Sequence, residues 1–280
     1  MWSMLRVIVG LTIAALCLPV SIPALTLDGK LVQGGMAIGR VEPGSTVHFQ
    51  GKAIRVSPHG LFVIGFSRDA PPEMSIDLRR PGGTVETHPI QIKARTWQVQ
   101  RIDGLPPRTV SPSPEDLARI GQEAALIQQA REQDDPRTDF SQTFIWPVTG
   151  RISGVFGSQR ILNGQPRRPH YGVDIAAPTG TPIQAPADGR VTLAHDDLFF
   201  SGGTLILDHG HGLSTVYMHL HKILVKTGDR VQQGDLIAQV GATGRVTGPH
   251  LHWGMNWFET HLDPSLLVPP MPEGAAAGGQ

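Results

Sequence analysis

Glycine and proline interrupt this chain so often that its sequence favours short strands and turns over long helices. Its 280 residues include 33 glycines and 24 prolines. The intervals between them hold short apolar runs rich in β-branched residues, which is typical of strands. Only one stretch, within residues 113–133, has apolar residues at helical spacing. The sequence therefore predicts a mainly β protein with a single linker helix.

Residues 25–102 predict a small β-sandwich of immunoglobulin-like type. Apolar and polar residues alternate there with a period of two, and turn residues bound each run. About seven short strands in such a length suit two packed sheets. The clearest segments and turns are residues 46–49, 53–56, 61–64, 75–78 and 90–92, with turns at Pro43-Gly44, Pro58-His59-Gly60 and Pro81-Gly82-Gly83.

Residues 103–140 predict a proline-rich linker followed by a helix. The linker, 103–112, is expected to be stiff and extended. Ser113 can cap the helix, Pro114 suits its first position and Asp116 can complete a capping box. An apolar stripe follows at helical spacing, namely Leu117, Ile120, Ala124 and Ile127. We expect this stripe to pack on one of the two domains, with a partner-binding helix as the alternative.

Residues 1–24 have the features of a secretory signal peptide. Arg6 precedes an apolar run over 7–20, and small residues lead up to Ala24. An uncleaved anchor is the alternative, but the run is short for a membrane span of about 20 residues. The single cysteine, Cys17, lies in this run, so a disulfide is not possible. We therefore expect export across the inner membrane to the periplasm, with membrane contact only if the segment stays uncleaved.

Charge and histidine content narrow the function further. Basic and acidic residues balance at 24 each, so the composition gives no reason to expect nucleic acid as a partner. Twelve histidines are many for this length, and nine of them lie between His170 and His261. That clustering indicates a site in residues 141–270. This region shows no sustained helical period and predicts an all-β domain, followed by a disordered tail over 271–280.

Two short motifs in this region could hold a metal ion. His170 and Asp174 are four residues apart, and Gly172 between them disfavours a helix. On a strand, both side chains would face the same side. His250 and His252, two apart, would also share a side of a strand. Two imidazoles and a carboxylate, with a fourth position left for water, are typical of a hydrolytic zinc.

A third segment could supply proton-transfer groups. His219 follows an apolar run and should share a strand face with Tyr217. No H-E-x-x-H motif occurs, and Glu259 is the only glutamate between residues 140 and 270. Histidine, with an ordinary pKa of about 6.5, is the better candidate for the base. Two of the four histidines would bind zinc and two would remain for proton transfer and oxyanion stabilisation.

Three motifs in order resemble the lysostaphin/LytM-type zinc endopeptidases of peptidoglycan. They are Pro169-His-Tyr-Gly-Val-Asp-Ile-Ala-Ala-Pro-Thr-Gly180, Tyr217-Met-His-Leu220 and Thr243-Gly-Arg-Val-Thr-Gly-Pro-His-Leu-His252, and the likeness covers roughly residues 145–262. One departure is Gly254, because many relatives have an acidic residue at that position.

The resemblance implies a fold, a cofactor, roles for five residues and a substrate. The ligands of one zinc ion per chain would be His170, Asp174 and His252, and the catalytic pair would be His219 and His250. The fold would be a LytM-type barrel-sandwich resembling a duplicated hybrid motif. The substrate would be the peptide stems and crosslinks of bacterial peptidoglycan, with a D,D-crosslink favoured. Tyr171 and Tyr217 are candidates for substrate contacts.

Other interpretations remain open at this stage. One alternative is a non-catalytic LytM-like regulator that activates another wall hydrolase, although such relatives usually lack a complete metal set. Another is that the N-terminal sandwich or the 113–133 helix blocks the groove that holds the metal site until it is displaced. The segment Asp208-His209-Gly210-His211 could form a second metal pair, but we expect it to be a hairpin that shapes the groove.

Overall fold

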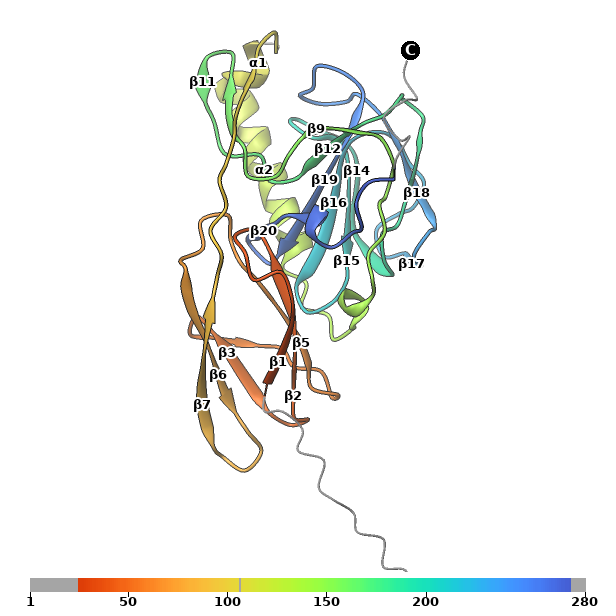
Figure 1. The fold of residues 1–280 in the computed structure, drawn as a ribbon. Helices are drawn as coiled ribbons and strands as arrows, with labels where there is room; N and C mark the ends of the chain where they lie inside the picture. The colour runs from red at the N-terminus through yellow and green to blue at the C-terminus, as the bar shows by residue number, and fades with distance from the viewer. Residues whose placement is uncertain (1–24, 106, 273–280) are drawn as a thin grey trace, which may run out of the picture.

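The computed structural model describes residues 25–105 and 107–272 and shows a mainly β molecule (Figure 1). The N-terminal region contains seven strands in two sheets, in the orders β1-β2-β5 and β4-β3-β6-β7, with antiparallel pairs throughout. The strands are β1 (Leu25–Gly29), β2 (Met36–Val41), β3 (Thr46–Phe49), β4 (Lys52–Ile54), β5 (Leu61–Gly65), β6 (Glu73–Arg79) and β7 (Val85–Gln91). The expected N-terminal β region is confirmed.

The alternation of apolar residues explains which faces of these sheets are buried. Phe62 and Ile64 of β5, and Ile76 and Leu78 of β6, are fully buried in one core shared by both sheets. Turns occur at all three Pro/Gly positions that the sequence indicated. Gly60 is needed at its turn: its φ is +79°, and an added Cβ would lie 1.9 Å from the Val41 carbonyl oxygen.

The linker forms more regular structure than its proline content predicted. β8 (Val99–Ile102), expected at the end of the sandwich, instead pairs in parallel with β10 (Gln159–Leu162) of the C-terminal region. α1 (Pro107–Val110) is a four-residue helix where an extended chain was expected. α2 (Pro114–Arg131) begins as predicted, with Ser113 as N-cap and a capping box completed by Asp116.

The C-terminal region is built on a ten-stranded sheet with the path β17-β14-β15-β16-β19-β12-β9. β13 and β18 pair with each other, β18 also pairs with β16, and β20 pairs with β19. Its elements are η1 (Asp139–Ser141), β9 (Arg151–Gly154), β12 (Val173–Ala176), β13 (Pro182–Gln184), β14 (Gly189–Leu198), β15 (Gly202–Asp208), β16 (Leu213–Ile223), β17 (Arg230–Val231), β18 (Leu236–Val240), β19 (His250–Trp257), β20 (Thr260–Leu262) and η2 (Pro264–Leu266). A small separate sheet joins β8 to β10 (Gln159–Leu162) and β11 (Gln165–Pro166).

One apolar core joins the N-terminal sandwich to the C-terminal sheet. Trp257 of β19 and Leu262 of β20 belong to the same buried cluster as Phe49 and Phe62. The rings of Phe49 and Trp257 lie 6.0 Å apart between centroids. The sandwich therefore packs directly on the strand that carries His250 and His252.

Helix α2 lies against the C-terminal sheet, as its apolar stripe indicated. Ile127 and Ala130 pack with Ile206 of β15 and Val216 of β16, whereas Leu117 at the other end of the stripe is 56% exposed. Val216 and Met218 face α2, and Met218 lies opposite His252 in the β16–β19 register. The helix therefore covers the part of the sheet face next to the histidine motifs.

Two predictions concern the chain ends. The predicted signal segment, 1–24, lies outside the described residues, as do residues 273–280 of the predicted tail. Met271 packs against the apolar core of the C-terminal region, so the chain is ordered beyond residue 270. Within the described part of the chain, no helix has the length and apolar character that a membrane span requires.

Candidate metal centre

His170, Asp174 and His252 come together as one buried cluster of metal-ligating groups. Their donor atoms all lie within 4.8 Å of one another. His170 Nε2 is 2.9 Å from His252 Nδ1 and 3.0 Å from Asp174 Oδ1, and His252 Nδ1 is 2.8 Å from the same oxygen. Ligands on a tetrahedral zinc ion, bound at about 2.0–2.1 Å, lie about 3.3 Å apart. A widening of a few tenths of an ångström would therefore let this set hold zinc.

Strand pairing positions two of these three groups. Asp174 on β12 is directly opposite His252 on β19, so their side chains project from the same face. His170 precedes β12 and does not lie on a strand, contrary to one of the geometries that the sequence allowed. Two glycines leave space for the cluster. A Cβ at Gly172 would lie 2.6 Å from the His252 ring, and a Cβ at Gly154 would lie 2.4 Å from Asp174 Oδ2.

A hydrogen bond determines which ring nitrogen of His170 can bind a metal ion. Its Nδ1 lies 3.1 Å from the Val155 carbonyl oxygen. A carbonyl can only accept, so Nδ1 carries the proton and Nε2 is left as the metal-binding atom. Such an outer contact is the usual way in which a protein orients a metal-binding imidazole.

Arg160 supports the carboxylate from the outer side, and nothing in the spacing of the sequence motifs had pointed to it. Its Nη2 lies 2.7 Å from Asp174 Oδ2, which leaves Oδ1 toward the two histidines. Burial acts to raise the pKa of Asp174, but the contacts with His170 and His252 outweigh it and hold that pKa well below its ordinary value. The carboxylate is therefore ionised, as a metal ligand must be.

His219 reaches the cluster through an irregularity in β16. Its φ is +65°, a left-handed conformation that is uncommon for a residue other than glycine. The β15–β16 register also shifts between Gly203 and Leu205. These features turn the ring toward the site, 4.9 Å from the His250 ring and 6.2 Å from the His252 ring between centroids.

His219 and His250 each have one nitrogen directed at the site. Nδ1 of His219 lies 2.9 Å from the Thr243 carbonyl oxygen, and Nδ1 of His250 lies 2.9 Å from that of Gly248. Both Nε2 atoms can therefore accept a proton. Burial, together with the charges of His250 and His252, lowers the pKa of His219 to about 3, so this ring is neutral at neutral pH. Burial likewise lowers the pKa of His252 to about 4.

Tyr217 is not available for substrate contact, which corrects one of the sequence-based expectations. Its side chain is fully buried, and its hydroxyl lies 2.9 Å from the Thr215 hydroxyl. Regular alternation would have placed Tyr217 and His219 on one face. The left-handed backbone at His219 breaks that alternation, so Tyr217 packs in the core with Leu205 and Trp253.

Tyr171 lies at the edge of the site and keeps its candidate role. It is partly exposed, and its ring stacks on His261 at 4.1 Å between centroids and an interplanar angle of 9°. His261 is partly buried, and burial lowers its pKa to about 3. The stack therefore pairs Tyr171 with a neutral imidazole next to the strand that carries His252.

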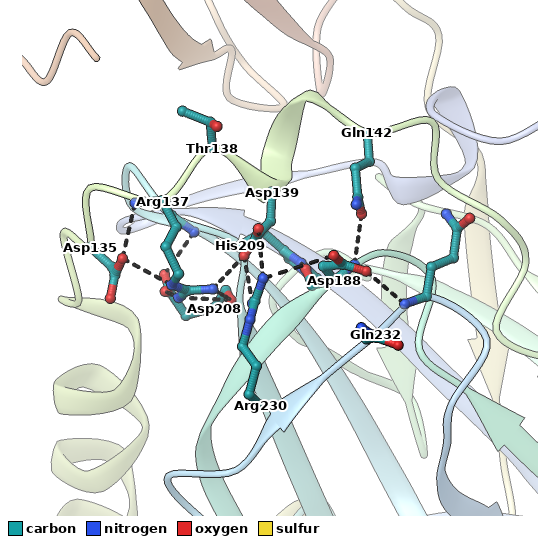
Figure 2. Close-up of polar contacts among 12 residues, drawn as sticks. Asp135, Arg137, Thr138, Asp139, Gln142, Asp188, Asp208, His209, Arg230 and Gln232 are labelled. Carbon is teal, nitrogen blue, oxygen red and sulfur yellow. Dashed lines mark hydrogen bonds and ion pairs between the residues drawn. The ribbon is translucent and has the colours of Figure 1, made fainter. Parts of the chain in front are cut away.

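His209, in the Asp208–His211 turn, has no ring nitrogen left to bind a metal ion. His209 Nδ1 donates to the Asp188 carbonyl at 2.7 Å, and its Nε2 accepts from the Thr215 hydroxyl at 2.8 Å, so both nitrogens are occupied. Ion pairs hold the turn against the preceding segment (Figure 2). Arg137 pairs with Asp208 of the turn and also with Asp135 and Asp139. The turn is the expected hairpin, which joins β15 to β16, and it also anchors the segment between α2 and η1.

Thr243 and Arg160 are the site residues that motif spacing did not single out. Thr243 acts through its backbone carbonyl, a group that every residue possesses. Arg160 lies ten positions before His170 in the chain and reaches Asp174 because backbone hydrogen bonds join Gly157 and Ser158, just before β10, to His170, just before β12. Neither contact has a local sequence signature.

Comparisons with known proteins agree with this geometry. Residues 168–264 match the model of peptidase family M23. The chain is 41% identical over 122 residues to the peptidoglycan DD-endopeptidase ShyC of Vibrio cholerae, covering 43% of this chain and 28% of ShyC. It is 43% identical over 104 residues to ShyA of the same organism, covering 37% and 24% respectively. The chain thus spans only about a quarter of the length of these curated relatives.

A solved structure extends the likeness to nearly the whole chain. It is a Pseudomonas aeruginosa protein described as a peptidase M23, with 33% identity and a TM-score of 0.67, and the match covers 85% of this chain and 95% of that one. The mainly β fold with its N-terminal β region and linker helix is shared over that length. From this coverage and the match at the metal cluster, the chain belongs to peptidase family M23, which confirms the LytM-type resemblance.

Proposed function

We propose that the protein is a zinc-dependent endopeptidase that hydrolyses peptide crosslinks of bacterial peptidoglycan. The observation that carries this proposal is the convergence of five side chains: the buried ligand set His170, Asp174 and His252, with His219 and His250 beside it. The relatives named peptidoglycan DD-endopeptidases support a D,D-crosslink as the bond. The partners would be the peptide stems of the wall, and the location would be the periplasm after export.

Zinc held by this set would act as a Lewis acid and lower the pKa of a bound water molecule. The chain's own residues would handle orientation and protons. Val155 and Arg160 hold His170 and Asp174 in position through their outer atoms. His219 and His250, whose Nδ1 atoms are tied to backbone carbonyls, present Nε2 for accepting a proton and stabilising negative charge.

Purified sacculi provide the direct test. The zinc-loaded protein should release soluble muropeptides, and complete removal of zinc by a chelator should abolish the release until zinc is restored. His219→Ala should lose at least about 100-fold in rate while still binding zinc, because general acid–base catalysis typically contributes about 10²–10⁴-fold. His195→Ala, a substitution outside the cluster, serves as the matched control and should cleave normally.

The outcome that contradicts the proposal is also definite. Undiminished cleavage by a demetallated sample would exclude zinc chemistry. No cleavage by a fully zinc-loaded sample would favour the non-catalytic regulator, which should then stimulate a separate wall hydrolase. Mass analysis of the muropeptides identifies the bond that is cut.

A further inference from the structure

A small cavity lies where the N-terminal sandwich meets the C-terminal region. Its volume is about 350 Å³, which is within the range of about 300–1,000 Å³ that small-molecule sites occupy. Its walls come from the turn between β2 and β3, the segment between β4 and β5, the segment before η1 and the turn between β15 and β16. The lining includes Ser45, Arg55, Val56, Pro58, Pro136 and His211, and none of the five residues of the metal centre.

Two buried polar side chains in this lining lack hydrogen-bond partners. Ser45 is 5% exposed and His211 is 2% exposed. The Ser45 hydroxyl and both ring nitrogens of His211 make no hydrogen bond within the described part of the chain. Because buried polar groups in folded proteins nearly always have partners, these two call for an explanation such as bound water or a ligand.

His211 is also held in a backbone conformation that costs energy. Its φ is +50°, in the left-handed region that is uncommon for residues other than glycine, and it lies between Gly210 and Gly212. Its backbone N–H donates to the Asp135 carbonyl at 2.8 Å, and its ring lies 4.8 Å from the Phe140 ring between centroids. Strained residues of this kind cluster at functional sites. Here the strain keeps an imidazole at the wall of the cavity, where a third glycine would fit the backbone more easily.

The charges at the cavity favour a neutral ligand. Arg55 Nε lies 2.7 Å from Asp134 Oδ1, so this cation is already paired. Burial lowers the pKa of His211 from its ordinary value of 6.5, so the ring is neutral at neutral pH. Asp134 and the backbone oxygens of Pro136 and Arg55 oppose that shift without reversing it. A neutral imidazole has one donor and one acceptor, and a hydroxyl is both, so the ligand must offer both as well.

Hydroxyl groups on a carbon ring meet these requirements. Val56, Pro58 and Pro136 give the cavity apolar walls that suit the C–H faces of such a ring. Its hydroxyl groups would pair with Ser45 and His211, in keeping with sites in which a few polar groups orient a ligand against an apolar lining. We propose that this cavity binds one neutral sugar residue at the boundary between the two regions. The residue is either a free sugar or a unit of a glycan strand, and the inference does not rest on the proposed function.

A titration of the full protein tests the inference. The ligands are N-acetylglucosamine, its β-1,4-linked trimer, sodium acetate and sodium phosphate, each added separately. Both sugars should shift the imidazole NMR signals of His211 in a saturable manner. Because a ligand that binds only the folded state stabilises it, each sugar should also raise Tm by about 3–5 °C at ten times its Kd. A trimer that binds at least tenfold more tightly than the monomer identifies a glycan strand as the source, and equal affinity identifies a free sugar.

Variants of the lining separate binding from folding. Ser45→Ala should weaken sugar binding about 2- to 10-fold, because one hydrogen bond is lost. Without sugar, this variant should be at least as stable as the wild type, since the hydroxyl that it removes is buried and has no partner among the described residues. Ser75→Ala, at an exposed serine on β6, is the matched control and should bind sugar as the wild type does.

His211→Asn removes the imidazole and keeps a residue that tolerates the left-handed backbone. It should weaken sugar binding about 5- to 100-fold, because two hydrogen bonds are lost. Both sugars should then no longer raise Tm at the concentrations that are effective for the wild type.

Three results would overturn the inference. One is saturable binding of acetate or phosphate, and not of sugar, at His211, which would make the cavity an anion site. Another is unchanged sugar affinity in both Ser45→Ala and His211→Asn, which would place the sugar elsewhere. The third is no saturable binding of any of the four ligands, which would leave only water in the cavity. Cleavage of wall peptides does not enter any of these results, so failure of the proposed function is tested separately.

Discussion

Asp174 and His252 are directly opposite one another in the antiparallel pair β12–β19, and Asp174 Oδ1 lies 2.8 Å from His252 Nδ1. The register of two strands thus brings together residues that are 78 positions apart in the chain. Because a shift of one residue would turn either side chain to the opposite face, the site depends on this pairing being held in place. Leu251 and Trp253, fully buried on either side of His252, hold it.

Replacement of Asp174 by asparagine should weaken zinc binding by more than about 100-fold. Loss of outer-shell partners already costs about 10- to 100-fold, and this change removes the anionic ligand itself. Competition with a chromophoric chelator measures the affinity. Asp196→Asn, an exposed carboxylate on β14, should bind zinc as the wild type does. Unchanged affinity in Asp174→Asn would exclude Asp174 as a ligand.

Replacement of Gly172 by alanine should disturb the site although it replaces none of the ligands. The new Cβ would lie 2.6 Å from the His252 ring and 2.7 Å from the Trp253 carbonyl oxygen. Such overpacking costs about 1–3 kcal/mol of stability and should also reduce zinc affinity. Thermal unfolding and chelator competition measure the two effects.

Gly121→Ala is the matched control for that substitution. A Cβ there meets nothing within 4 Å, and the residue lies within α2. Because alanine favours the helix over glycine, this variant should gain about 0.5–1 kcal/mol and leave zinc binding unchanged. A loss of stability at both positions would mean that the close contact at Gly172 is not the cause.

Tyr217→Phe should leave catalysis intact. Its hydroxyl contacts Thr215 in the core, so the change removes one buried hydrogen bond, at a cost of about 1 kcal/mol in the free energy of unfolding. Denaturant unfolding and kcat/KM on the same sample separate the two quantities. A drop in kcat/KM beyond about threefold with normal zinc content would restore Tyr217 as a substrate contact.

His209 should make the fold sensitive to acid. Burial lowers its pKa from 6.5 to about 4, so between these values the unfolded state binds more protons than the folded state. The stability that His209 contributes is therefore present above pH 6.5 and falls as the pH drops toward 4, by up to about 3 kcal/mol.

Comparison with a variant isolates that contribution from those of other buried histidines. His209→Gln should be less stable than the wild type at pH 7, because its contacts with Asp188 and Thr215 are altered. Its free energy of unfolding should, however, fall less steeply between pH 6.5 and 4. Parallel pH profiles for the two proteins would show that His209 does not carry the effect.

Much of the local structure followed from short-range patterns. The segment 46–49 was expected to be a strand and is β3, and the capping box of Ser113 and Asp116 begins α2. These features depend on alternation and on hydrogen bonds between residues a few positions apart, which a sequence displays directly. The pairing of β8 with β10 could not be predicted in this way, because the residues of a strand do not indicate with which other strand it will pair.

By itself, the sequence determined the mainly β character, the helix that links the two regions, and the identity of the side chains that could hold a metal. Those properties are local, since they arise from side-chain chemistry and the period of apolar residues. The tertiary structure alone decided which of those side chains meet. The left-handed backbone at His219 turned its ring to the site and left Tyr217 in the core, and β10 placed Arg160 against Asp174. Such contacts result from strand register and chain crossing, which depend on packing across the whole fold rather than on neighbours in the chain.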